Sequence, residues 1–298
     1  MPNLLSPIIQ KQSIQLCDGK ILTDSAGIET IQHFYNQAKL FHDITIEIGM
    51  KKMEWIDGNM SAVLGSALYQ LKKTNNLRFI VNFQDVQAKF KILFENGLIS
   101  IKGINKVGNG NSSTIPLKMF APDDKDGFVD YVLNELLVHS EMPKFSESVK
   151  NYLLEDLAEL CGNINLHSQN TIDPFFVCGQ YFRGKKQIIF TVTDLGKGFL
   201  PKISLIDHTV NNDREAIQWA VNGNSSKIDA PGGIHLFRMK NFMQKNEGQI
   251  HIISGSAYYN SESEDKEQAN GCITKTSQNF MGSTVHLIFN KKVLTSKK

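Results

Sequence analysis

The sequence predicts an α/β protein, because stretches with helical spacing of apolar residues alternate with short apolar stretches typical of strands. Residues 44–48 (ITIEI) and 77–81 (LRFIV) have the composition of buried strands. Residues 26–40 and 60–71 repeat apolar side chains at the spacing of one helix face. This alternation favours an α/β architecture for the N-terminal region.

The overall composition is ordinary for a globular protein. The 298 residues suffice for one large domain or two ordinary ones, with a core that needs no disulfide or metal. Apolar residues make up 41% of the chain and charged residues 21%, which matches typical soluble domains. A net charge of +2 provides no general field for attracting nucleic acid, so we expect no nucleic-acid partner.

We expect a cytoplasmic protein that does not associate with a membrane. The first residues, MPNLLSPIIQKQSIQL, lack a basic stretch followed by a continuous apolar core. No run of about 18 uncharged apolar residues occurs anywhere in the sequence. The four cysteines follow no metal-ligand spacing, and we expect reduced thiols.

Two polar stretches predict a domain boundary. Residues 103–114 are rich in Gly, Asn and Ser, and residues 121–126 are polar with a proline, so both are expected to be loops. We therefore divide the chain into a first domain (1–105), a linker with a connecting helix (106–145) and a second domain (146–298).

The second half of the chain begins with helices and continues with strands. Apolar spacing predicts helices over residues 128–139 and 145–167. Strands dominate residues 175–193, and the polar stretch 261–270 (SESEDKEQAN) is expected to be a solvated loop between two strands.

A stripe of polar residues on the second of these helices is the first candidate site. Glu159, Asn163 and His167 are spaced by four, so all three lie on one helix face. A solvated polar face is the ordinary explanation of such a stripe. Here it borders an apolar stripe, which indicates a pocket wall; the apolar residues are Leu153, Leu157 and Leu160.

The second candidate is the segment 191–199 (TVTDLGKGF), in which a β-branched strand leads into Asp194, Gly196 and Gly198. An aspartate at a strand end can accept a hydrogen bond from a buried donor. The two glycines allow positive φ or the close approach of a ligand. A tight turn without a ligand would have the same pattern.

Two further glycine segments complete the candidates. Gly232 and Gly233 precede the predicted helix 236–245, and free N–H groups at a helix N-terminus attract anions. The segment Gly282, Ser283 and Thr284 leads into a predicted strand at 285–289. Hydroxyls at such a strand start either cap the backbone locally or donate to a ligand.

In their order and spacing, these four segments resemble the N, G1, G2 and G3 boxes of the GHKL ATPases, the superfamily of histidine kinases, anti-sigma serine kinases, gyrase and large heat-shock chaperones. The patterns are ExxxNxxxH, DxGxG, a glycine-rich turn into a helix, and a strand that begins with small and hydroxyl residues. The resemblance covers residues 146–290. It implies an α/β sandwich with a mixed, largely antiparallel sheet backed by helices, and ATP between the helix layer and a flexible lid.

The resemblance also implies roles for single residues. Glu159 matches the residue that polarises the attacking water or hydroxyl, and Asn163 matches the ligand of Mg²⁺. Asp194 matches the carboxylate that accepts from the adenine amino group. Gly196 and Gly198 would shape that end of the pocket.

The remaining motif positions concern the phosphates and the lid. Gly232 and Gly233 would bring backbone N–H groups onto the phosphates, Thr284 would support the adenine side, and residues 211–230 resemble the ATP lid. His235 departs from the pattern, because many members have a second glycine there. Its side chain would either narrow the phosphate pocket or contact phosphate.

The N-terminal region resembles the STAS domain of anti-sigma factor antagonists. The resemblance rests on residues 53–71, on the strand that follows, and on a helical segment ending at Gly97-Leu98. The family switch is a serine or threonine directly after an aspartate, but here Gly58 and Asn59 follow Asp57, and Ser61 lies further on. This difference favours a scaffold or docking role over phosphorylation.

Three hypotheses for function remain. The first is a serine/threonine kinase or ATPase that acts on a regulatory protein partner, with Glu159 as base and Mg²⁺ on the phosphates. The second is a nucleotide-gated binding module with little turnover. The third is a degenerate fold that binds no nucleotide. A histidine kinase is disfavoured, because His139 stands too close to Glu159 for a helical hairpin. The oligomeric state, including a homodimer, is left open.

Overall fold

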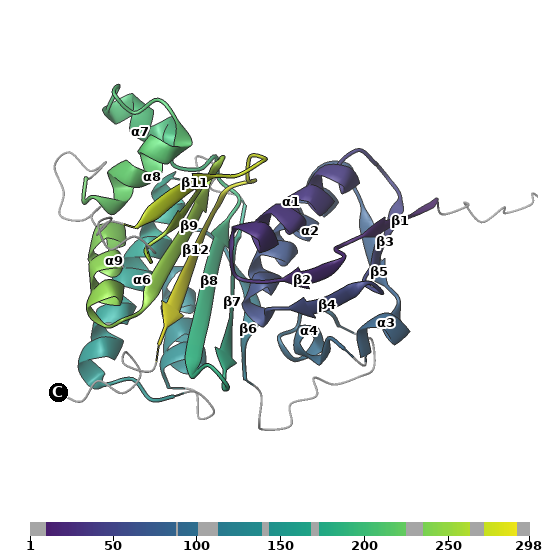
Figure 1. Cartoon of the computed structure of the whole chain (residues 1–298), viewed down its shortest axis with the longest axis horizontal. Coiled ribbons are helices and arrows are strands. Elements are labelled where there is room, and N and C mark those ends of the chain that lie inside the picture. The colour runs from purple at the N-terminus through teal and green to yellow at the C-terminus, as the bar shows by residue number, and fades with distance from the viewer. Residues whose placement is uncertain are drawn as a thin grey trace, which may run out of the picture.

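The prediction of a mixed α/β protein is confirmed by the computed structural model, and a seven-stranded antiparallel sheet is its largest element (Figure 1). The strand order is β11-β10-β9-β12-β8-β7-β6, and every neighbouring pair is antiparallel. The structure describes residues 10–87, 89–100, 113–138, 143–167, 173–224, 235–262 and 271–290. The strands are β6 (Thr114–Phe120), β7 (Phe175–Phe182), β8 (Gln187–Asp194), β9 (Gln249–Ser254), β10 (Ala257–Asn260), β11 (Cys272–Lys275) and β12 (Ser283–Phe289).

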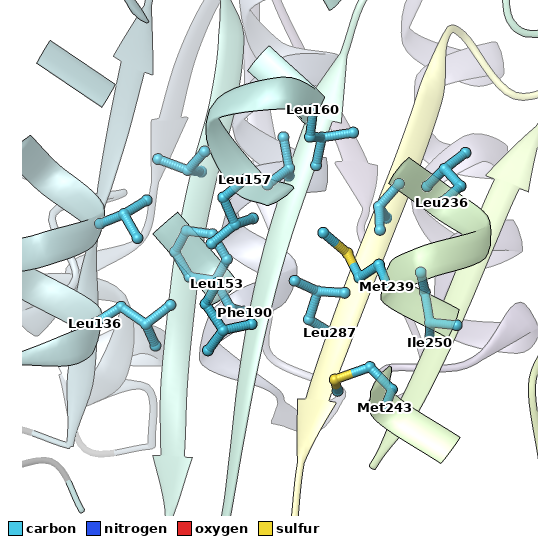
Figure 2. Packing of buried hydrophobic residues seen from close by; sticks show 14 of the residues in the cluster. Leu136, Leu153, Leu157, Leu160, Phe190, Leu236, Met239, Met243, Ile250 and Leu287 are labelled. Atoms are coloured by element: carbon cyan, nitrogen blue, oxygen red, sulfur yellow. The ribbon is translucent and has the colours of Figure 1, made fainter. Parts of the chain in front are cut away.

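Helices cover one face of this sheet and enclose the main core. The longest is α6 (Glu147–His167), which lies beside α9 (His235–Lys245). Leucines of α6 and methionines of α9 point onto the sheet (Figure 2). Their strand partners are buried aromatic and aliphatic side chains: Phe190, Ile250 and Leu287. The predicted apolar stripe of the 145–167 helix therefore forms the centre of the core.

The N-terminal elements form a smaller parallel sheet with its own helices. Its strands are β1 (Lys11–Gln15), β3 (Thr45–Gly49) and β5 (Arg78–Val81), in the order β1-β3-β5. A separate parallel pair joins β2 (Gly19–Ile21) to β4 (Met53–Ile56). The helices are α1 (Ser25–Ala38), η1 (Gly58–Met60), α2 (Ser61–Asn75), α3 (Phe83–Gln87) and α4 (Lys91–Glu95).

This N-terminal part covers the second face of the seven-stranded sheet (Figure 1). The elements η1 and α2 lie on β7 and β8. The backbone N–H of Gly58 donates to Gln180 Oε1 at 2.6 Å, and Asn59 Nδ2 donates to Thr191 Oγ1 at 2.9 Å. Because both faces are covered, every residue of β12 is buried, including the polar Thr284 and His286.

The predicted linker 106–145 differs from the structure, which includes much of it in the seven-stranded unit. Strand β6 pairs with β7, and α5 (Lys125–Tyr131) continues as a π-helix, η2 (Val132–Leu137), that packs near α6. Pro116 lies in β6 beside a register shift, and proline is tolerated there because β6 is an edge strand. Residues 106–112 and 139–142, including His139, lie outside the described residues.

In the part of the chain that the structure describes, no helix combines the length and apolar character that a bilayer span requires.

Candidate functional site

A pocket lies where the ends of α6, β8, α9 and β12 meet, between the sheet and the helix layer. Two further helices, α7 (Leu200–Ile206) and α8 (Asp213–Val221), contribute its outer rim. The structure thus brings together residues of all four candidate segments. Those that line the pocket are Asn163, Asp194, Gly196, Gly198, His235 and Ser283.

Asp194 stands at the floor of this pocket as the last residue of β8. Its Oδ1 accepts from the Gly196 N–H at 2.7 Å, and the N–H and hydroxyl of Ser283 also donate to the carboxyl. Burial raises the pKa of Asp194 to about 6, while the hydrogen bonds from Gly196 and Ser283 oppose the rise. The group is therefore ionised at neutral pH and presents acceptors to the pocket.

Two glycines allow the chain to form this floor. Gly198 has φ +79°, and Gly282 has φ +146°. A Cβ on Gly282 would lie 2.0 Å from the backbone oxygen of Asp194, so no other residue could stand there without moving β12. The turn after β8 is also fixed to β9, because the Phe199 N–H donates to Ser254 Oγ at 2.8 Å.

Asn163 forms the opposite wall and is paired with His235. Its Nδ2 lies 2.6 Å from His235 Nδ1 and 3.2 Å from Nε2. Asn163 is only 4% exposed, and its Oδ1 has no hydrogen-bond partner among the described residues. A buried amide oxygen without a partner is costly, which points to a ligand at this position.

Of the remaining predicted site residues, the structure describes only Glu159 and Thr284. Glu159 is on α6 one turn before Asn163 and is half-buried, but it is not among the residues that line the pocket. Gly232 and Gly233 lie outside the described residues, as does the side chain of His167.

Thr284 faces away from the pocket. Its Oγ1 lies 3.0 Å from Thr193 Oγ1, on the face that the N-terminal part covers. Ser283 stands directly opposite Asp194 in the strand pair and lines the pocket, whereas Thr284 does not. The family resemblance implied Thr284, rather than Ser283, as the site residue. Paired residues on neighbouring strands point to the same face of a sheet, and successive residues point to opposite faces. Ser283, which pairs with Asp194, therefore shares its face, and Thr284 does not.

The segment predicted as a lid is a helix in its first half. Helix α8 is capped by Asn212, whose side chain accepts from the Glu215 N–H, and Asp213 accepts from the N–H and hydroxyl of Ser256. Trp219 of α8 lines the pocket, and its indole N–H donates to Asp207 at 3.0 Å. Residues 225–230 are outside the described residues. Trp219 lies within the predicted lid but was not among the predicted site residues.

Within the described residues, no three His, Cys, Asp or Glu side chains are grouped as a metal site would require. A cation in this pocket would therefore need oxygen ligands from a bound molecule in addition to Asn163. Comparisons of the chain with protein-family profiles, with curated proteins and with solved structures return no match.

Asp194→Asn is expected to change the pH dependence of unfolding. The folded protein holds a proton on Asp194 up to about pH 6, whereas the unfolded chain releases it near the ordinary value of 3.8. Ionisation thus lowers wild-type stability as the pH rises through this window, and asparagine has no such cost. From about pH 4 to about pH 7, the variant should gain on the order of 2 kcal/mol relative to wild type, since pocket water screens part of the effect.

Urea unfolding at several pH values measures this difference. Asp126→Asn is the matched control, because Asp126 is exposed and distant in sequence from the pocket. A difference between Asp194→Asn and wild type that stays constant with pH would contradict the raised pKa.

Proposed function

We propose that the chain is an ATP-binding regulatory protein of the GHKL type, with the base and phosphates of ATP in the pocket described above. One observation carries this proposal: Asp194, an acceptor-only carboxylate, lies at the floor of a largely apolar pocket. The adenine amino group would donate to it. The apolar walls suit a flat base, and they include Leu160, Ile164, Val192 and Val285.

The Asn163 wall fits the Mg²⁺ that accompanies ATP. Magnesium binds oxygen ligands and uses few protein groups together with substrate phosphates. The buried, unpartnered Oδ1 of Asn163 is a ligand of this kind. When bound, the metal would neutralise charge on the phosphates. Asn163 would hold it, and the first turn of α9 would lie beside it.

The activity that we propose is phosphorylation of a regulatory protein partner or ATP hydrolysis coupled to such a partner. Glu159 would act as the base, because α6 carries it on the same face as Asn163. A nucleotide-gated binding module with little turnover is the second candidate. His235 favours this alternative, because its ring occupies pocket wall where a glycine would leave space.

We also propose a two-domain arrangement in which the N-terminal part is a STAS-like docking domain. Gly58 and Asn59, which stand where the family has its phosphorylated residue, are buried against the sheet. Ser61 is also buried, and Asn96 Nδ2 donates to its hydroxyl at 2.8 Å. A kinase could not reach these positions without opening the contact, which supports docking over phosphorylation.

The test combines binding and label transfer. Purified protein is titrated with Mg-ATP in a calorimeter, and incubated with γ-labelled ATP alone and with cell lysate. Free phosphate or labelled protein would support an enzyme, and binding of ATP without hydrolysis would support the gated module. If ATP fails to bind at millimolar concentration, the proposal is wrong.

A second signal for binding comes from tryptophan. The chain has two tryptophans, Trp55 and Trp219. In Trp55→Phe the remaining indole lines the pocket, so a change in its fluorescence with ATP places the ligand there.

A further inference from the structure

His235 has a contact that its place in the sequence does not explain. It is the first residue of α9 and is 6% exposed, and both of its ring nitrogens lie within hydrogen-bond distance of Asn163 Nδ2. An apolar side chain would fill this position equally well if only packing mattered. The imidazole instead supplies an acceptor to one side of a buried amide.

The orientation of that amide decides what the pocket can bind. An asparagine side chain has a donor NH₂ on one side and an acceptor oxygen on the other. With Nδ2 held by His235, Oδ1 is the atom that remains buried without a partner among the described residues. The reversed orientation would direct N–H groups to the same place and would repel a cation.

We propose that His235 is a positioning residue that accepts from Asn163 Nδ2 and thereby turns Oδ1 toward Mg²⁺ on the bound nucleotide. This inference rests on the proposed ATP site. It assigns to His235 the preference for metal-bound over metal-free nucleotide, rather than a direct contact with phosphate. Residues behind a metal ligand commonly change metal affinity by about 10-fold to 100-fold when they are replaced.

The test compares two types of replacement at position 235. His235→Ala removes the acceptor, whereas His235→Asn retains an oxygen acceptor close to the place of Nδ1. Mg-ATP and ATP with EDTA are titrated into each variant, and the ratio of the two affinities is the readout. His208→Ala is the control, because His208 is exposed and does not line the pocket.

We expect His235→Ala to lower the Mg-ATP preference by about 10-fold or more and to change metal-free ATP affinity by less than about 3-fold. His235→Asn should restore most of the preference. His235→Phe, which retains a ring without an acceptor, repeats the alanine test if alanine destabilises α9. Circular dichroism checks folding of each variant.

The experiment distinguishes a failure of the proposed function from a failure of the inference about His235. If wild type binds neither form of ATP, the proposed function is wrong. If wild type prefers Mg-ATP and the acceptor-free variants keep that preference, or lose both forms equally, His235 does not position Asn163. An asparagine variant that behaves like alanine would also overturn the inference.

Discussion

Asp194→Ala is expected to lose ATP binding, and wild type is expected to bind GTP about ten thousand times more weakly than ATP. The adenine edge carries an amino donor where guanine carries a carbonyl acceptor. Guanine would therefore set an acceptor against the carboxylate of Asp194, which the Gly196 N–H and Ser283 already hold in place. A polar group left without its partner in a pocket costs much of the binding free energy.

Calorimetric titration of ATP, ADP and GTP measures this discrimination in wild type and in Asp194→Ala. Circular dichroism shows whether the variant is folded, and Asp126→Asn controls for the loss of one negative charge. Similar affinities for ATP and GTP in wild type would remove Asp194 from the base pocket. Unaltered ATP affinity in the variant would do the same, and most of the case for a GHKL site would go with it.

Glu159→Gln is expected to lower any turnover of ATP by about 100-fold while ATP affinity changes little. A base acts on the proton of the attacking water or hydroxyl, and glutamine cannot take that proton. The side chain is not among the pocket-lining residues, so the ground-state contacts with nucleotide should remain. Steady-state phosphate release and calorimetry together separate the two effects.

Glu155→Gln is the matched control on the same helix. Glu155 lies about one turn before Glu159 and is paired with Arg238 at 3.4 Å. If Glu159→Gln has wild-type turnover, Glu159 is not the base. If both variants lose activity equally, the effect belongs to α6 as a whole. A wild type with tight ATP binding and no turnover would favour the gated module.

Periodicity in the sequence predicted the elements that form the core. The apolar stripe of α6 and the β-branched run that ends at Asp194 have strong local patterns, and tertiary contacts in the structure agree with them. Strand β6 was missed because it follows a glycine-rich stretch and contains Pro116, which locally indicates a loop. Its pairing with β7 supplies stability that the local sequence does not reveal.

The candidate site was predictable as a set of segments, but not as a set of contacts. Motif order led to Asn163, Asp194 and the glycines that follow β8. The choice between Ser283 and Thr284 depends on which residue stands opposite Asp194, and therefore on strand register. The contact between His235 and Asn163 joins residues far apart in the chain, and no local pattern predicts it.

Strand β8 separates the pocket from the N-terminal part. The side chains of Val192 and Asp194 line the pocket, while those of Thr191 and Thr193 face the N-terminal part. In a sheet with one solvent-exposed face, every second side chain points into water and makes few packing contacts. Here each of the four side chains is enclosed, either in the pocket or on the side of the N-terminal part. A substitution on one face that displaces the backbone of β8 would therefore also move the side chains on the other face.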